Sequence, residues 1–337
     1  VEPWPHQLRT FYRMYEQWPP RLLIADEVGL GKTITAGLLL RQAWFSGRAK
    51  RILILTPAAV LRQWQLELRE KFNLNWPIYD GHRLRWAKCP SFGDVGAKEK
   101  VVTPDAWHHE PFVLASSQLM RRRDRRRELL ENAEPYDLVV LDEAHHARRR
   151  GAGADDGGRP NMLLELMRRL REKTDGLLLL TATPMQIDPI EVWDLLDLLG
   201  LPREWSPVAF TQFFERLSTG NPSDSDMASA ARLFRAAERE YGETLEEEVE
   251  RIVPDRAHYY PALVLSRLRE GSDHSIRSMD TDLRKAAIRV MRANTPIARR
   301  VARHTRKLLR GYRDTGLLGL QIADRDVQDD FISLSDD

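Results

Sequence analysis

The sequence predicts an α/β fold, in which an open parallel β-sheet is covered on both faces by helices and a helical subdomain is attached. Two observations support the sheet: short, continuously apolar runs recur along the first part of the chain, and helical patterns lie between them. Such runs are typical of parallel strands that are buried on both faces. A third observation supports the subdomain, because beyond about residue 205 the apolar runs fade and helix-like segments rich in alanine, arginine and glutamate follow.

The expected strands, in chain order, are Leu22–Ala25, Ile52–Thr56, Val113–Ala115, Leu138–Leu141 and Leu177–Thr181. Expected helices include Thr33–Trp44, Ala59–Phe72 and Met162–Arg171, and a basic helix over Ala286–Arg310 is expected to kink at Thr295–Pro296. Most of these strands end where a polar or glycine-bearing motif begins. Because parallel sheets bind ligands at the carboxyl ends of their strands, we expect these motifs to converge on one crevice.

Composition limits the function classes. The 337 residues carry a formal net charge of only +2, so local basic clusters would have to attract nucleic acid. The one cysteine, Cys89, excludes a disulfide framework and a four-cysteine metal site, and it favours a reducing, cytoplasmic location. No uncharged apolar run approaches the roughly 18 residues of a membrane span, so no membrane partner is expected.

The first motif, DEVGLGKT over residues 26–33, directly follows an expected strand and precedes a helix. A turn of small residues at a helix N-terminus lets backbone N–H groups surround phosphate oxygens, and Gly29 and Gly31 permit that path. Lys32 is expected to reach the β- and γ-phosphates of ATP, and Thr33 to ligate magnesium. The general pattern requires glycine where this chain has Asp26. A glycine-rich turn with a surface lysine is the alternative.

The second motif, LVVLDEAHH over residues 138–146, places two adjacent carboxylates at a strand end, where successive side chains point in different directions. Asp142 is expected to hold magnesium, and Glu143 to orient and deprotonate the attacking water. His145 lies close enough to sense the γ-phosphate. An Asp-Glu pair that caps a surface helix is the alternative.

The third motif, LLLLTATPMQ over residues 177–186, ends an expected strand in Thr181 and Thr183. Their hydroxyls are expected to hydrogen-bond the acidic motif and to couple the nucleotide state to movement, without breaking bonds themselves. Taken alone, this segment also fits a strand that ends in an ordinary turn.

Three motifs in this order resemble those of superfamily 2 helicases, and DEVGLGKT resembles the Swi/Snf-type branch, whose phosphate loop begins with an acidic pair. DEAHHARRRG and LLLLTATPMQ are most similar to the bacterial RapA-like branch, which is associated with RNA polymerase or with phage-defence and restriction systems. ILILTPAAVLRQW over residues 52–64 resembles motif Ia, and VLASSQL over 113–119 resembles motif Ib. The resemblance is dense over residues 1–200 and thin over 206–298.

The resemblance implies a recombinase-like (RecA-like) P-loop lobe over residues 1–205 and a helical protrusion over 206–298. Residues 299–337 would form a closing helix and a linker. It also implies that Gln7 reads adenine, for which a helix-capping role is the alternative. The implied nucleotide-binding set is Gln7, Asp26, Gly29, Leu30, Gly31, Lys32 and Thr33.

The resemblance further implies a DNA-facing surface, formed by Thr56, Pro57, Gln63, Trp64, Ser116 and Ser117. A core position is the alternative for Trp64. The arginine run RRRDRRR follows the motif Ib segment, and its first three members could contact phosphates without reading sequence. These are Arg121, Arg122 and Arg123. The run could equally be a solvated helix face paired with Glu128 and Glu131.

The family has a second lobe whose arginine fingers can increase the rate by about 10³–10⁵. The sequence ends at FISLSDD, where that lobe would begin, so a fragment that binds ATP weakly and hydrolyses it very slowly is expected. The leading hypothesis is the ATP-binding lobe of a DNA-dependent ATPase that translocates on double-stranded DNA. A strand-separating helicase and a non-catalytic, nucleotide-gated scaffold remain alternatives. RNA polymerase or a defence-system or restriction-system subunit are the candidate partners.

Overall fold

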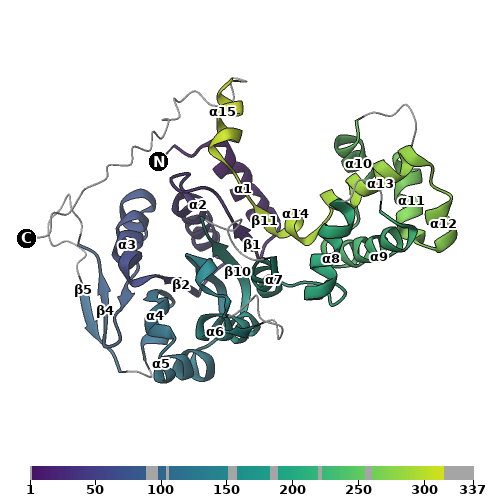
Figure 1. Ribbon diagram of the computed structural model, residues 1–337. Helices are drawn as coiled ribbons and strands as arrows, with labels where there is room; N and C mark the ends of the chain where they lie inside the picture. Colours follow the sequence, from purple (N-terminus) through teal and green to yellow (C-terminus); the bar gives the residue numbers. More distant parts are fainter. Residues whose placement is uncertain are drawn as a thin grey trace, which may run out of the picture.

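The centre of the computed structural model, which describes residues 2–88, 98–103, 106–150, 158–182, 189–218, 222–254 and 260–314, is a nine-stranded β-sheet (Figure 1). The strands lie in the order β11-β1-β10-β7-β2-β6-β3-β4-β5. Their bounds are β1 Arg21–Ile24, β2 Ile52–Thr56, β3 Ile78–Tyr79, β4 Arg83–Trp86, β5 Lys98–Val101, β6 Phe112–Ser116, β7 Tyr136–Leu141, β10 Thr174–Leu180 and β11 Val301–Ala302. A separate antiparallel pair is formed by β8 Arg149–Arg150 and β9 Arg159–Pro160.

The α/β fold is confirmed, but the expectation of a purely parallel sheet is wrong at one edge. Strands β11 to β3 pair in parallel, whereas β3, β4 and β5 pair antiparallel. The five expected strands are all present; Ile52–Thr56 has the predicted bounds, and the ends of the other four are shifted. The additional strands carry no apolar run that would reveal them, because β3 and β11 have two residues each and β5 is an exposed segment of charged residues.

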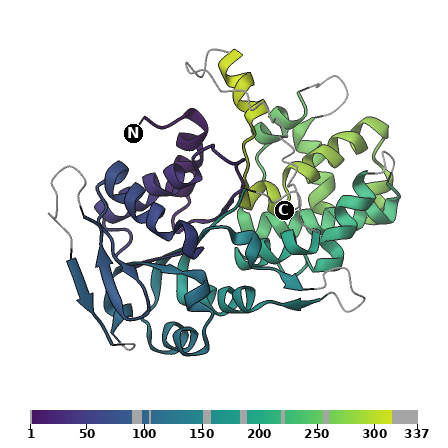
Figure 2. The same cartoon turned by 60° about the vertical axis from the view of Figure 1, so that its left-hand side comes forward.

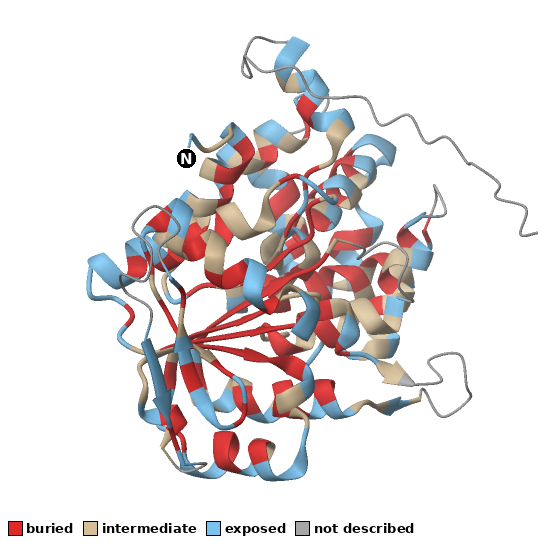
Figure 3. Cartoon of the chain, turned by 90° about the vertical axis from the view of Figure 1, so that its left-hand side faces the viewer, coloured by how far each residue is buried: buried red, intermediate tan, exposed pale blue. Residues whose placement is uncertain are grey.

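Two layers of helices cover the sheet, which explains why its central strands are apolar on both faces. Ile52 and Ile54 of β2 face one core and the intervening Leu53 and Leu55 face the other. On the first face lie α1 Pro5–Glu16, α2 Lys32–Phe45 and α3 Ala58–Phe72. On the second lie α4 Ser117–Met120, α5 Arg123–Arg127, α6 Met162–Leu170 and α7 Pro189–Leu198. Figure 3 shows the strands as the buried centre between these layers.

A third hydrophobic core lies outside the sheet, among the helices α8 Pro207–Ser218, α9 Asp224–Tyr241, α10 Glu246–Ile252, α11 Pro261–Glu270, α12 Asp273–Arg277 and α13 Thr281–Ala293. Trp205, Phe210 and Phe234 are among its largest members. These helices lie beside the sheet domain, as Figures 1 and 2 show. None of the helices in the described ranges has the length and apolar character needed to cross a lipid bilayer.

The chain then returns to the sheet. The expected kinked helix over Ala286–Arg310 is wrong, because α13 ends at Ala293 and a new helix, α14 Pro296–Arg300, begins behind the side-chain cap of Thr295. Strand β11 follows and pairs with β1, and α15 Arg306–Asp314 lies next to α1 (Figure 1). Proline at the first helical position removes an N–H group that has no acceptor there, so it favours a new helix start rather than a kink.

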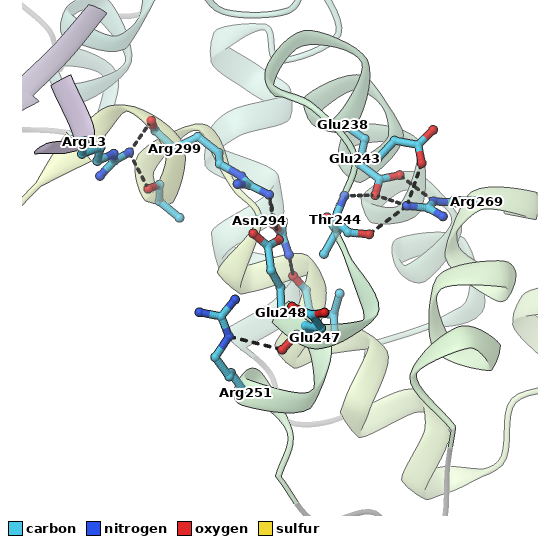
Figure 4. Close-up of polar contacts among 12 residues, drawn as sticks. Arg13, Glu238, Glu243, Thr244, Glu247, Glu248, Arg251, Arg269, Asn294 and Arg299 are labelled. Carbon is cyan, nitrogen blue, oxygen red and sulfur yellow. Dashed lines mark hydrogen bonds and ion pairs between the residues drawn. The ribbon is translucent and has the colours of Figure 1, made fainter. Parts of the chain in front are cut away.

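Arginine side chains join the helical part to the sheet domain (Figure 4). Arg13 of α1 donates to the backbone carbonyls of Ala298 and Val301 at 3.1 and 3.2 Å. Arg299 in turn donates to Asn294 Oδ1 at 2.7 Å and to Glu248 Oε2 at 3.3 Å. Burial, together with nearby Arg299, lowers the pKa of Arg13. The carbonyl acceptors offset this crowding of charge and fasten α14 to α1.

Candidate nucleotide-binding site

The loop between β1 and α2 has the geometry of an anion cradle. Gly29 and Gly31 have φ angles of +85° and +77°, in the left-handed region that favours glycine. A Cβ atom on Gly31 would lie 2.4 Å from Gln7 Nε2, so a larger residue there would displace the Gln7 side chain. The first helical hydrogen bonds of α2 run from Ile34 and Thr35 to the Gly31 carbonyl. The preceding N–H groups, of Lys32 and Thr33, therefore lack intrahelical acceptors and mark a helix N-terminus suited to phosphate.

Lys32 lies between the loop and the acidic motif. Its Nζ donates to the backbone carbonyl of Asp26 at 3.0 Å. Burial lowers the pKa of Lys32, and the opposing charges of Glu143, Asp26 and Asp142 act in the other direction. The ammonium therefore already faces both carboxylates of the acidic motif, although 110 positions separate it from Asp142 in the sequence.

The carboxylate of Asp26, which we expected among the nucleotide-binding residues, points elsewhere. The residue is fully buried, and its Oδ1 accepts hydrogen bonds from the backbone N–H and from Nδ1 of His304, both at 2.8 Å. Both bonds direct this side chain toward residues 302–306, and a role of Asp26 in nucleotide binding stays a prediction. The backbone carbonyl of Asp26 accepts a hydrogen bond from Lys32, and the charge of the Asp26 carboxylate also acts on the Lys32 ammonium.

Glu27 completes this attachment of the carboxyl-terminal segment. Its backbone N–H donates to the His304 carbonyl at 3.2 Å, and its Oε2 accepts from the Arg306 N–H at 3.0 Å. The Arg306 guanidinium donates to the Val28 carbonyl at 3.0 Å. Sequence reasoning missed His304 and Arg306, because nothing in their local pattern indicates contact with a loop nearly 280 residues earlier.

Gln7 takes the helix-capping alternative in this structure. Its Oε1 accepts from the Trp4 N–H at 2.9 Å, which completes a capping box at the start of α1. Its Nε2 donates to the Leu30 carbonyl at 3.0 Å, and His6 Nε2 lies 3.1 Å from the same carbonyl. Gln7 thus holds the phosphate loop by Leu30, and its amide keeps one further N–H and one further lone pair, so contact with adenine stays a prediction.

The acidic pair of the second motif lies at the carboxyl end of β7. Asp142 Oδ1 accepts from the Glu143 N–H at 2.9 Å, and Oδ2 accepts from Trp64 Nε1 at 2.7 Å. Burial raises the pKa of Asp142, and these two hydrogen bonds oppose that effect. Glu143 has a φ of +51°, an uncommon backbone conformation for a residue other than glycine. Such outliers cluster at functional sites.

His145 joins the second and third motifs. Its Nδ1 lies 3.1 Å from Glu143 Oε2 and 3.0 Å from Thr181 Oγ1. The hydrogen bond from His145 is the main cause of the lowered pKa of Glu143. The structure therefore brings together His145, Glu143 and Thr181, whereas Thr183 lies outside the described residues.

Magnesium and a nucleotide fit these residues. Each Asp142 oxygen accepts one hydrogen bond, which leaves lone pairs for a cation, and the Thr33 hydroxyl has no hydrogen bond within the described ranges. No group of three or more His, Cys, Asp or Glu that could hold a metal occurs among the described residues. Magnesium usually takes one or two protein ligands and completes its shell with phosphate oxygens and water, so Thr33 and Asp142 would suffice to hold it.

The residues expected on the DNA-facing surface divide into two groups. Thr56, Ser116 and Ser117 are buried, and so is Trp64 at 2% exposure, so direct DNA contact by these side chains is corrected. Buried Ser116 caps α4 through the N–H groups of Gln118 and Leu119. The outer group contains exposed Gln63, Arg122 and Arg123 and half-buried Pro57 and Arg121.

The later arginines of the run form ion pairs with glutamates, as the alternative interpretation of the run predicts. Arg125 Nη1 lies 2.6 Å from Glu128 Oε1, and Arg127 Nε lies 3.1 Å from Glu131 Oε2. Within the described ranges, Arg122 and Arg123 have no ion pair and remain available to an external anion.

The fold and the site define a P-loop, ATP-binding domain of the helicase-like class, with a phosphate loop after β1, an acidic pair after β7 and a hydroxyl after β10. The family model of the SNF2-related domain matches residues 6–299, and the chain belongs to this family. It is thus a Swi/Snf-type ATPase domain, and its RapA-like character is confirmed by relatives of about 35% identity.

Two of these relatives are RNA polymerase-associated proteins RapA. That of Serratia proteamaculans is 35% identical over 217 residues, which cover 61% of this chain and 20% of the relative. That of Vibrio atlanticus is 33% identical over 244 residues, which cover 72% of this chain and 23% of the relative. The chain spans about a fifth of the length of the curated relatives that it matches.

Two solved structures with a similar fold are SWI2/SNF2 ATPase cores from Sulfolobus solfataricus. The core domain alone has a TM-score of 0.45 at 14% identity, over 91% of this chain and 76% of that chain. The core in complex with double-stranded DNA has a TM-score of 0.44 at 16% identity, over 86% of this chain and 66% of that chain.

Proposed function

We propose that this chain is the ATP-binding lobe of a motor that hydrolyses magnesium-ATP and translocates on double-stranded DNA. The observation that carries the proposal is the convergence of Lys32, Asp142 and Glu143 at the carboxyl edge of the sheet. A cation from a phosphate loop opposite two carboxylates is the arrangement that phosphoryl transfer requires. Membership of the SNF2-related family supports the same chemistry.

In this proposal the chain binds and orients the nucleotide. Lys32 exchanges the Asp26 carbonyl for the β- and γ-phosphates, and the free N–H groups at the start of α2 hold phosphate oxygens. Thr33 and Asp142 hold magnesium, which supplies charge neutralisation when it is bound. Glu143, kept ionised by its lowered pKa, accepts the proton of the attacking water. When Glu143 gains or loses a proton, its hydrogen bond with His145 changes, and His145 passes this change to Thr181.

Duplex DNA is the proposed track. Strands β2 and β6 are neighbours in register, with Thr56 opposite Ser116, so the segments that follow them lie at the same edge of the sheet. The Ala58 N–H also donates to Gln118 Oε1 at 3.0 Å, which ties the two segments together. Exposed Gln63, Arg122 and Arg123 would contact phosphates from this edge without reading sequence.

The cargo of the motor is proposed by analogy. The relatives carry the name RNA polymerase-associated protein, so RNA polymerase is the first candidate partner, and a subunit of a defence or restriction system is the second. Co-purification of the complete natural polypeptide with each candidate, with and without ATP, distinguishes the two.

ATP hydrolysis by the complete natural polypeptide tests the proposal, with no nucleic acid, with single-stranded DNA or with duplex DNA. Strong stimulation by duplex DNA is expected, and Lys32→Ala should abolish it with a loss of roughly 10²-fold or more, because a charge that stabilises the transition state is removed. Stimulation by single strands alone would favour the strand-separating helicase. No stimulation by any DNA would favour the nucleotide-gated scaffold.

A further inference from the structure

Trp64 connects α3 to the carboxylate that would hold magnesium. Its indole Nε1–H donates to Asp142 Oδ2 at 2.7 Å, a short hydrogen bond across 78 positions of sequence. The residue packs with the core between α3 and the sheet and is almost fully buried. The N–H group therefore has one acceptor, and that acceptor is part of the proposed catalytic site.

The acceptor distinguishes this contact from those of other tryptophans. A buried tryptophan needs a partner for its N–H group, and that partner is a backbone carbonyl for Trp193 and Trp205 and the Glu128 carboxylate for Trp107. The carboxylate that Trp64 binds belongs to the proposed site. A bond to a carboxylate is stronger and fixes the direction of the oxygen that accepts it. Of the two Asp142 oxygens, Oδ1 is fixed by the adjoining backbone N–H and Oδ2 by Trp64. The indole thus sets the rotation of the carboxylate.

The same helix reaches the proposed DNA track. Helix α3 begins at Ala58, whose N–H donates to Gln118 Oε1 in the segment after β6. Gln63, the residue next to Trp64, is exposed on the outer side of the helix. A helix is stiff over this distance, so a displacement of its outer face moves the indole with it. No other described side chain hydrogen-bonds to the Asp142 carboxylate.

We propose that Trp64 is a positioning residue that orients Asp142 for magnesium and transmits the position of α3, and so the occupancy of the DNA track, to the ATP site. This inference rests on the proposed function, and it replaces direct DNA contact by Trp64 with an indirect role. A shift of α3 by a few tenths of an ångström changes the length and angle of a directional hydrogen bond. Catalytic geometry is sensitive to displacements of this order.

The test compares Trp64→Phe with Trp76→Phe in the complete natural polypeptide. Trp76 is buried in the same core and stacks on Phe112, and its indole N–H has no partner among the described residues, so Trp76→Phe makes the same chemical change without touching the site. Three quantities are measured: the magnesium dependence of ATPγS binding by calorimetry, the stimulation of hydrolysis by duplex DNA, and the melting temperature. The melting temperature shows how much stability each variant loses through the smaller side chain, so that this loss can be separated from an effect on the site.

Trp64→Phe is expected to raise the magnesium concentration needed for half-maximal ATPγS binding by about five- to tenfold, and to remove most of the DNA stimulation. Trp76→Phe should change neither by more than about twofold, since it removes packing alone. Equal behaviour of the two variants would overturn the inference. If the wild-type protein shows no DNA stimulation, the translocase proposal fails, while the magnesium dependence of binding still decides the role of Trp64.

Discussion

Two Asp-Glu pairs in this chain have the same local sequence but contact different parts of the structure. Asp26-Glu27 follows β1 and Asp142-Glu143 follows β7, both at the carboxyl edge of the parallel sheet. The first pair is bonded to His304 and Arg306 and holds a distant segment of the chain against the phosphate loop. The second pair is bonded to Trp64 and His145, and carboxylates of both pairs act electrostatically on Lys32. The difference shows that carboxylates at a strand end can serve either a binding site or the packing of the fold. Which of the two they serve depends on the segments of the same polypeptide that lie beside the strand end.

The position of the two pairs in the sheet explains the difference. Strand β1 lies next to the edge strand β11, so the residues that leave β1 have residues 302–306 beside them. Backbone N–H groups of that segment donate to Asp26 Oδ1 and to Glu27 Oε2. Strand β7 lies between β10 and β2, in the middle of the sheet. Its acidic residues lie at the crevice, where Trp64 and His145 are the side chains of the described ranges that hydrogen-bond to their carboxylates.

The largest expected effect separates the two glutamates. Glu143→Gln should lower ATP hydrolysis by about 10²–10⁴-fold, because the amide cannot accept the proton of the attacking water, while ATP binding persists. Glu27→Gln is the matched control, since glutamine still accepts the Arg306 N–H through its amide oxygen. Single-turnover hydrolysis and nucleotide affinity are measured for both. If the two variants lost the same amount of hydrolytic activity, the proposed difference between the two acidic pairs would be wrong.

The next effect separates the two aspartates. Asp26→Ala should lower the free energy of unfolding by about 1–3 kcal/mol, because it leaves the buried donors of His304 without an acceptor. Asp142→Ala should instead impair magnesium-dependent nucleotide binding. Urea denaturation and calorimetry measure the two quantities. A double-mutant cycle of Asp26→Ala with His304→Ala should be non-additive, and additive losses would show that the two residues stabilise the fold independently.

The smallest effect concerns pH. The His145 hydrogen bond lowers the pKa of Glu143, so in the wild type this base stays ionised as the pH falls below neutrality. His145→Ala removes the bond, the pKa of Glu143 rises toward its ordinary value, and a larger fraction is protonated at a given acidic pH. The acid limb of the hydrolysis profile should therefore move to higher pH. His108→Ala is the control, since His108 precedes the amino end of β6 and the acidic motif follows the carboxyl end of the parallel strand β7. An unmoved acid limb in His145→Ala would mean that another group controls it.

The sequence by itself determined the α/β class, the five central strands and the residues of the phosphate loop and acidic motif. These features are local: an apolar run, two glycines before Lys32, and carboxylates at a strand end each occupy a few adjacent residues. A period or a spacing is enough to recognise them.

Tertiary structure alone decided what each of these side chains touches. It directed Asp26 to His304, placed Trp64 on Asp142, and gave Gln7 a bond to the loop instead of an open amide. It also added β11 and the antiparallel edge strands, which are too short or too polar to be recognised. The physical reason is that hydrogen bonds between residues far apart in sequence depend on how the chain returns to the sheet, and no local pattern encodes that return.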